Sequence, residues 1–280
     1  MTVAQRREAV QFLIQHGLAE RRACSLLDLH RSTFQYQARP PRDDELVEQV
    51  HTLAQRHQRY GYRRIWALLR RRGHRINKKR IHRLWKSAKL QVRKVRRKRR
   101  PPPTNGVPVQ ATHPGHVWTY DFVHDHCLNG APLKILTVMD EFTREGLALE
   151  VATSLPSSRV IVVLDQLFTT HGAPEFIRSD NGPEFIAVAL RGWLAQQHTA
   201  TLYIDPGCPW QNGYGESFNG TVRDECLNLE VFHTVAEARV RLAAYRREYN
   251  EERPHSSLGY RTPAEFKRDW LQGQSQPESL

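Results

Sequence analysis

The segment from Arg59 to Arg100 holds twenty Lys or Arg residues and no Asp or Glu. A helix face that is merely solvated normally carries both signs of charge, so this imbalance favours contact with the phosphates of a nucleic acid. A solubilising surface is the less favoured alternative. The whole chain is basic as well, with a formal charge of +13 and a pI of about 10.0, and nucleic acid is the leading candidate polyanion.

A linker follows this basic run. The sequence Pro101-Pro102-Pro103-Thr104-Asn105-Gly106 has almost no apolar side chains and could hardly form part of a core. A chain of 280 residues is long enough for two or three modules. We therefore predict a basic, proline-rich linker over residues 93–112.

Two small helical modules are predicted before the linker. Residues 1–38 show a first helix that ends at Gly17, a second that begins at Glu20, and a short segment that ends at Tyr36. This spacing suits a helix-turn-helix that reads a DNA groove, and it suits an ordinary helical hairpin equally well. Residues 43–92 form the second, basic module, where the candidate phosphate contacts are Arg63, Arg64, Lys78, Lys79 and Arg80.

Beyond the linker the pattern changes to strands and helices, over residues 113–268. Three successive strands predict antiparallel hairpins, and the later alternation of helix and strand predicts a parallel α/β unit. The strands expected are 116–123, 133–139, 146–151, 175–179 and 199–204, and the helices are 157–171, 183–197, 215–227 and 235–249. The fold class is thus α/β with a mixed sheet, and we expect a disordered tail over residues 269–280.

Other classes of protein are disfavoured. No stretch approaches the roughly 18 uninterrupted apolar residues of a membrane-spanning helix, so we expect no membrane partner and a cytoplasmic protein, nucleoid-associated when bound to DNA. Neither a zinc site nor a disulfide framework is indicated by the scattered cysteines, Cys24, Cys127, Cys208 and Cys226.

Three acidic residues stand in unusual places. Asp121 lies mid-strand, where aspartate is disfavoured. Asp180 ends a strand and Glu216 begins a helix, and each taken alone fits a turn or a first-turn residue. As a set they can converge at one edge of a sheet, where carboxylates repel one another unless cations neutralise them. Such ligands suit Mg²⁺ or Mn²⁺, and two ions about 3.5 to 4 Å apart would support phosphoryl transfer.

The sequence motifs around these acids resemble those of a known family, the second-frame (OrfB) proteins of insertion-sequence transposases of the IS-three type. These proteins are related to retroviral integrases. The motifs are Trp118-Thr119-Tyr120-Asp121-Phe122, Asp180-Asn181-Gly182-Pro183-Glu184-Phe185, the run from Gln211 to Gly220, and the run from Tyr249 to Tyr260. Thirty-five residues separate Asp180 from Glu216, as in that family. The resemblance implies an RNase H-like core in which Asp121, Asp180 and Glu216 are catalytic and bind metal.

The resemblance also implies a function and partners. The function is metal-dependent cleavage at the ends of an insertion element and strand transfer into target DNA, with two Mg²⁺ or Mn²⁺ ions when DNA is bound. The implied partners are double-stranded DNA of the element ends and target, further copies of the chain on DNA, and an upstream-frame protein or a fusion with it. The alternatives are a DNA-binding regulator or scaffold with a degenerate RNase H-like domain, and a plain RNase H-type nuclease.

Further residues near the triad remain candidates. Asn219 and Arg223 follow Glu216 by three and seven positions on the same helical face, which would aim them at DNA near the metals. A surface role for Arg223 is equally favoured. Asn181 either orients a ligand or forms the turn, and Glu184 is interpreted as a first-turn helix residue. Asp140, at a strand end, is not placed in the site.

Overall fold

The computed structural model describes residues 1–37, 43–92, 109–180, 182, 185, 187–205 and 208–274. The chain forms two compact units, Met1–Gln49 and Val50–Leu280, and their boundary falls inside helix α4 (Asp44–Arg56). Within the described ranges, no helix is both long enough and apolar enough to cross a membrane.

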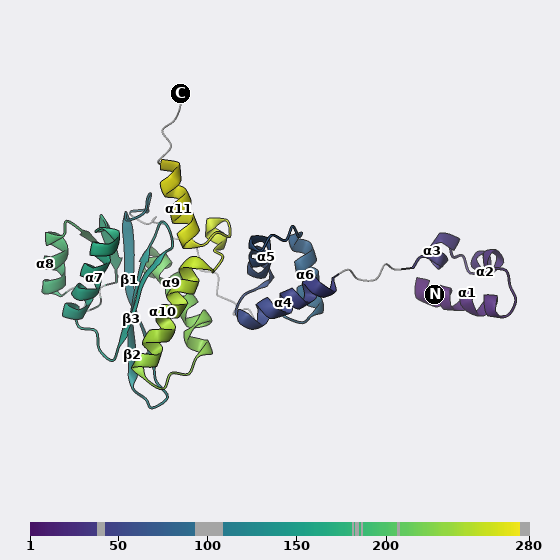
Figure 1. The fold of residues 1–280 in the computed structure, drawn as a ribbon, viewed down its shortest axis with the longest axis horizontal. Coiled ribbons are helices and arrows are strands. Elements are labelled where there is room, and N and C mark those ends of the chain that lie inside the picture. The colour runs from purple at the N-terminus through teal and green to yellow at the C-terminus, as the bar shows by residue number, and fades with distance from the viewer. Residues whose placement is uncertain are drawn as a thin grey trace, which may run out of the picture. The chain divides into compact units, whose positions relative to one another are not determined.

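The first unit contains three short helices among its described residues, α1 (Val3–Gln15), α2 (Glu20–Leu26) and α3 (Arg31–Gln35) (Figure 1). A capping box between Thr2 and Gln5 satisfies backbone donors at the start of α1. Gly17 follows α1 with a φ of +91°, a conformation that glycine adopts without steric cost. The helices enclose a small core of Val10, Ala23, Cys24 and Leu29.

The second unit begins with the end of α4, followed by α5 (Tyr62–Arg71) and α6 (Lys78–Ser87). Residues 50–92 are called the basic module below. Its apolar side chains recur at helical spacing and are buried, namely Val50, Leu53, Ile65, Leu69, Ile81 and Trp85. Asn77 caps α6 by accepting a hydrogen bond from the backbone of Lys79. Because the apolar side chains of these helices face the core, most of their Lys and Arg side chains lie on the surface.

The rest of the second unit, residues 109–274, is called the sheet domain. Its described residues form one five-stranded sheet in the order β3-β2-β1-β4-β5. The strands are β1 (Val117–His126), β2 (Pro132–Asp140), β3 (Gly146–Ala152), β4 (Phe176–Ser179) and β5 (Ala200–Tyr203). β1, β2 and β3 pair antiparallel, whereas β4 is parallel to β1 and β5 is parallel to β4. The predicted α/β fold with a mixed sheet is confirmed.

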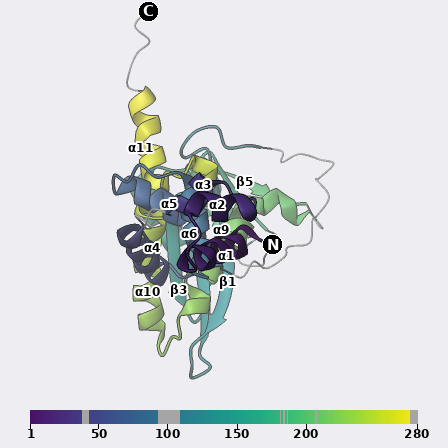
Figure 2. The ribbon, with the colours of Figure 1, turned by 90° about the vertical axis from the view of Figure 1, so that its right-hand side faces the viewer.

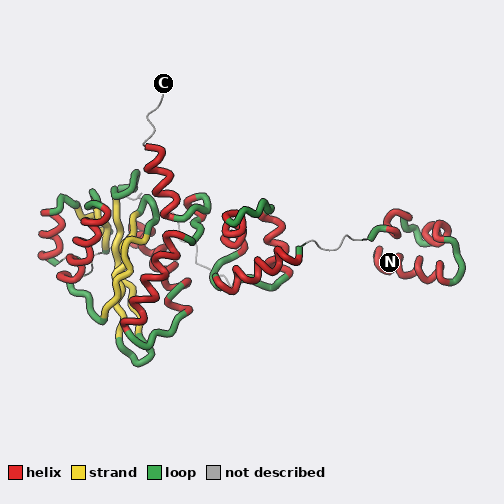
Figure 3. The backbone as a smooth tube through the Cα atoms, viewed as in Figure 1, coloured by secondary structure: helices red, strands yellow, loops and turns green. Residues whose placement is uncertain are grey.

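Helices cover both faces of this sheet (Figures 1 and 3). α9 (Gly213–Glu225) and α10 (Val235–Glu251) pack on one face, and α10 lies beside β3 (Figure 2). α7 (Ser157–His171) and α8 (Val188–Gln196) pack on the other. Burial on both faces explains why residues 133–139 form a nearly continuous apolar run. Short 3₁₀ helices occur at Pro209–Asn212, Leu227–Leu229 and Ser256–Leu258.

Two expectations about the elements need revision. The disordered tail expected from residue 269 is wrong for residues 269–274, because α11 (Pro263–Gln274) continues through them. Phe266 and Trp270 lie one helical turn apart on α11, and both pack against Phe142. These contacts stabilise α11 beyond residue 268. The helix expected over 183–197 is observed as α8 from Val188, and residues 183, 184 and 186 lie outside the described residues, as do residues 275–280.

Candidate active site

The carboxyl ends of β1 and β4 meet at one edge of the sheet. These strands are parallel, and Thr119 of β1 is opposite Arg178 of β4. Asp121 and Asp180 each follow by two residues, so they lie side by side and project from the same face as Thr119 and Arg178. The backbone N–H of Gly182 donates to Asp180 Oδ1 at 2.9 Å.

The start of α9 is held tightly against β1. Thr119 Oγ1 donates to Asn212 Oδ1 at 2.6 Å, and both side chains are buried. A Cβ atom on Gly215 would lie only 2.7 Å from Asn212 Oδ1 and 2.9 Å from Thr119 Oγ1. Glycine is therefore required for this close approach, which brings the next residue, Glu216, to the same edge as Asp121.

The Asp121 carboxylate is fixed by two donors. Asn219 Nδ2 donates to its Oδ2 at 2.8 Å, and the backbone N–H of Phe122 donates to its Oδ1 at 2.7 Å. Asn219 is itself held, because its Oδ1 accepts from Thr137 Oγ1 at 2.8 Å. Asn219 had been predicted to contact DNA, and here its amide instead orients Asp121.

The charges of the three acids act on one another. Burial raises the pKa of Asp121 to about 6; the Phe122 N–H opposes this rise, and the negative charges of Asp180 and Glu216 add to it. Asp121 is thus destabilised as an anion by both of its predicted partners. Among the described residues, no three His, Cys, Asp or Glu side chains form a ready-made metal site as they stand.

The other predicted site residues lie in two places. Arg223 is exposed on α9, and its Nη2 donates to the carbonyl oxygen of His124 on β1 at 2.9 Å. Arg64 Nη1 donates to Glu225 Oε1 at 2.6 Å, so its guanidinium is occupied within the protein. The remaining cations are exposed on α5 and α6, namely Arg63, Lys78, Lys79 and Arg80. Asn181 and Glu184 lie outside the described residues.

A buried ion pair that sequence reasoning missed lies behind the acids. Arg178, two residues before Asp180, donates through Nε to Glu141 Oε1 at 2.8 Å, and the two side chains are only 3% and 0% exposed. Arg178 Nη2 also donates to the carbonyl of Val109 at 2.7 Å. Burial raises the pKa of Glu141 and the Arg178 charge lowers it, with a net rise. Asp140 accepts from three backbone N–H groups and holds a turn.

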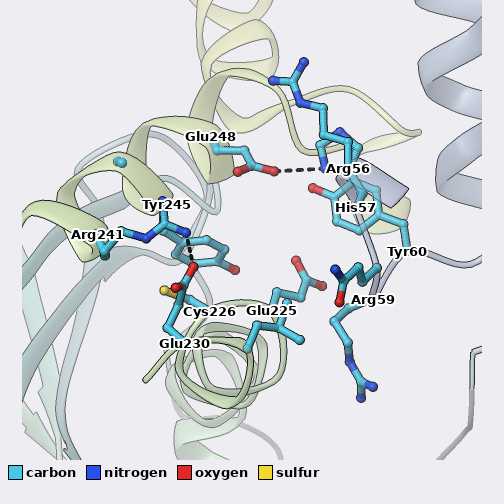
Figure 4. A pocket seen from close by; sticks show the side chains of 13 residues that line it. Arg56, His57, Arg59, Tyr60, Glu225, Cys226, Glu230, Arg241, Tyr245 and Glu248 are labelled. Atoms are coloured by element: carbon cyan, nitrogen blue, oxygen red, sulfur yellow. Dashed lines mark hydrogen bonds and ion pairs between the residues drawn. The ribbon is translucent and has the colours of Figure 1, made fainter. Parts of the chain in front are cut away.

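The basic module docks on the sheet domain through opposite charges. Each pair has its basic member on the module and its acid on the sheet domain: Arg56–Glu252 (2.8 Å), His57–Glu248 (3.0 Å), Arg59–Asp224, Arg64–Glu225 (2.6 Å) and Arg71–Glu265. A pocket of about 320 Å³ lies at this junction. Figure 4 shows side chains that line it, with the His57–Glu248 contact on its wall. The charges that line it are largely paired, which favours a structural role.

Glu225 is the central residue of this junction. Its carboxylate accepts from Arg253 at 2.6 and 2.7 Å in addition to Arg64. Burial alone would raise the pKa of Glu225, but the bonds from Arg253 and Arg64 outweigh it and lower the pKa. Because Glu225 belongs to α9, the helix that carries Glu216 is linked directly to the basic module.

Comparison with known proteins identifies the domains. A family model described as an HTH-like domain matches residues 41–99, and two models described as integrase core domains match residues 111–209 and 197–263. The catalytic core domain of HTLV-2 integrase, solved in complex with magnesium, aligns with a TM-score of 0.46 and 17% identity, covering 56% of this chain and 99% of that one.

Relatives along nearly the whole chain come from insertion elements. The 39.2 kDa protein of element IS476 from Xanthomonas euvesicatoria is 41% identical, with 95% of this chain and 78% of that protein covered. The 31.7 kDa protein of element IS407 from Burkholderia multivorans is 43% identical, with 89% and 91% covered. The transposase InsD of element IS2D from Escherichia coli is 30% identical, with 81% and 79% covered.

Proposed function

We propose a mechanism for this chain from the premise that it belongs to the insertion-sequence transposases of the IS-three type, as a second-frame (OrfB) protein. It is a DNA transposase with an integrase core. The proposed reaction is cleavage at the ends of the element, followed by attack of the freed 3'-hydroxyl on target DNA. The proposed catalytic residues are Asp121, Asp180 and Glu216. The observation that carries this is the parallel pairing of β1 with β4, which sets Asp121 beside Asp180, together with the close contact of the start of α9 with β1.

The donor set fits divalent cations. Three carboxylates provide only hard oxygen ligands, which suit Mg²⁺ or Mn²⁺. Burial is the main cause of the raised pKa of Asp121, and the charges of Asp180 and Glu216 add to the rise, so a bound cation would offset a cost that the carboxylates now bear. We propose that Asp121, Asp180 and Glu216 hold two such ions when DNA is bound. The chemistry that such ions supply is stabilisation of the attacking and leaving oxygens of an in-line phosphoryl displacement.

The chain's own residues keep the acids in place. Asn219 and the Phe122 N–H fix the orientation of the Asp121 carboxylate, and the N–H of Gly182 holds Asp180. The close contact at Gly215 sets the position of Glu216. The acids, which all lie in the described part of the chain, do not form a metal site as they stand, and these contacts limit how far they must move to bind the ions. The proposal needs no side-chain nucleophile, because water attacks in the first step and the 3'-hydroxyl in the second.

DNA is held, in this proposal, by the basic module. The exposed cations Arg63, Lys78, Lys79 and Arg80 are assigned to phosphates of double-stranded DNA. Arg223 is assigned to DNA close to the acids, whereas Arg64 and Asn219 are assigned to structural contacts. The predicted boundaries stay part of the proposal, with modules at 1–38 and 43–92 and a linker at 93–112. Further copies of the chain, and an upstream-frame protein or fusion, are proposed to complete the assembly.

A strand-transfer assay tests this function. The full chain, together with the upstream-frame protein if the element encodes one, is incubated with duplex oligonucleotides of the element ends and Mg²⁺ or Mn²⁺. We expect nicked and joined products, and their loss in Asp121→Asn, Asp180→Asn and Glu216→Gln with duplex binding retained. Asp125→Asn, on the same strand as Asp121, is the matched control and should remain active.

Three results would contradict the proposal. Full activity of any triad variant would remove that residue from the mechanism. Binding without cleavage by the wild type would favour a DNA-binding regulator or scaffold. Cleavage without joining would favour a plain RNase H-type nuclease.

A further inference from the structure

α9 presents three distinct faces. Gly215, Phe218 and Val222 are buried against the sheet. Asn219 and Arg223, on the face of Glu216, bond to residues of β1. The third face borders that of Glu216 and is formed by Ser217, Gly220, Thr221 and Asp224, which recur at helical spacing.

This third face forms one wall of a groove. The opposite wall belongs to the basic module, and the groove between them has a volume of about 780 Å³. The module contributes Arg59, Tyr62, Arg64, His82 and Trp85 to its lining. It is called the α6–α9 groove below, and Ser217 in its wall is the immediate neighbour of Glu216.

We propose that the α6–α9 groove binds a single strand of DNA that is unpaired next to the cleavage site. This proposal rests on the proposed function and extends it, because it assigns a separate subsite to one strand of the substrate. A volume of about 780 Å³ lies within the range of pockets for small ligands. It can take a few nucleotides but not a duplex.

Aromatic rings in the groove suit unpaired bases. The rings of Tyr62 and His82 lie with centroids 4.3 Å apart and planes tilted by 33°. His82 is exposed and Tyr62 is partly exposed, so these rings are accessible from the groove. Stacking on aromatic side chains is the usual way in which proteins hold single-stranded nucleic acid without reading its sequence.

The charges in the groove permit an anionic strand. Asp224 is paired with Arg59 and Glu225 with Arg64, so neither acid presents an uncompensated negative charge. Arg223 also lines the groove, and the His124 carbonyl to which it donates carries no charge. The net charge of these five side chains is therefore positive, which favours a phosphate backbone.

The groove is also preformed. Arg59 and Arg64 connect α9 to the start of α5, and Glu225 is held from the other side by Arg253. The Arg253 and Glu225 side chains are only 6% and 7% exposed, so this connection is shielded from solvent ions. A groove whose walls are already fixed loses less entropy when it takes a ligand.

Fluorescence anisotropy with two probes tests the proposal, using a short oligo-dT strand and a hairpin duplex that both lack element sequence. In the full chain, Tyr62→Ala/His82→Ala should weaken binding of the single strand about tenfold or more, as expected for one lost base stack, and should change duplex binding less than about twofold. The matched control Lys78→Ala/Lys79→Ala should weaken duplex binding more than single-strand binding. Tyr62→Phe should retain single-strand binding because its ring can still stack, and the retained duplex binding of Tyr62→Ala/His82→Ala excludes misfolding of the module as the cause.

Photocrosslinking adds an independent readout. An oligonucleotide with 5-iododeoxyuridine should crosslink to Tyr62 or His82, and to the Asp121→Asn variant as readily as to the wild type. Unchanged single-strand affinity in Tyr62→Ala/His82→Ala, equal losses on both probes, or crosslinks confined to other surfaces would each overturn the proposal. Because Asp121→Asn is expected to abolish strand transfer but not this binding, failure of the groove and failure of the catalytic proposal are distinguishable.

Discussion

Replacing Asp121 by Asn should stabilise the metal-free fold while it abolishes catalysis. Burial, together with the charges of Asp180 and Glu216, raises the pKa of Asp121 from 3.8 to about 6. At neutral pH the folded protein therefore keeps an ionised carboxylate in a place that disfavours the anion. Asparagine has nearly the same shape and no charge, so this electrostatic cost disappears, whereas its single amide oxygen can accept only one of the two hydrogen bonds that fix the carboxylate.

The magnitude follows from the pKa rise. A rise of about 2 units at 1.36 kcal/mol per unit corresponds to about 3 kcal/mol as an upper value. Partial exposure of Asp121 to solvent and the lost hydrogen bond reduce this, and we expect Asp121→Asn to add about 1 kcal/mol to the free energy of unfolding at pH 7.5. For an acid whose pKa is raised by folding, the cost is absent below pH 4, grows between pH 4 and pH 6, and is complete above pH 6.

Urea unfolding in EDTA, at several pH values from 4 to 7.5, measures this effect. The difference in unfolding free energy between Asp121→Asn and the wild type should appear as the pH rises through that window. Asp125→Asn removes a carboxylate from the same strand and should not reproduce the pH-dependent gain. A difference between the variant and the wild type that does not change with pH between 4 and 6 would refute the raised pKa of Asp121.

Three further predictions concern the stability of the junction at Glu225, the position of α9 and the binding of duplex DNA. Glu225→Gln leaves Arg253 buried without its counter-charge and should lower the free energy of unfolding by about 3 to 5 kcal/mol in urea; a loss below about 1 kcal/mol would contradict this. Gly215→Ala should displace the start of α9 and reduce strand transfer far more than the urea midpoint, and normal activity would disprove the close contact. Alanine at Lys78, Lys79 and Arg80 should reduce the salt dependence of duplex binding by about 1 in log–log slope per lost contact, whereas an unchanged slope would remove them from the DNA surface.

The order of strands and helices could be predicted because its patterns are local. Residues 133–139 are apolar throughout since both faces of β2 are covered, and Trp118, Tyr120 and Phe122 alternate along β1. Asp121 was conspicuous as an acid in the middle of such a strand. The tail was predicted wrongly because Phe266 and Trp270 alone make a weak pattern, and their partner Phe142 is remote in the sequence.

The supporting contacts of the site could not be predicted, since they join residues that are distant along the chain. Helical spacing placed Asn219 on the face of Glu216 but could not show that this face meets Asp121, 98 positions away. Arg64 was one of twenty cations in its segment, and nothing local distinguishes it as the partner of Glu225. Thr119 and Asn212 looked like ordinary strand and turn residues, although their hydrogen bond docks α9.

The most direct measurement is anomalous X-ray diffraction from crystals of the protein with element-end DNA and Mn²⁺, prepared from the wild type, from Asp121→Asn and from the Asp125→Asn control. The account predicts manganese density in contact with Asp121 and at least one of Asp180 and Glu216, beside a DNA phosphate, and no such density in Asp121→Asn. Manganese bound elsewhere, or a phosphate seated far from these three carboxylates, would contradict the proposed catalytic centre.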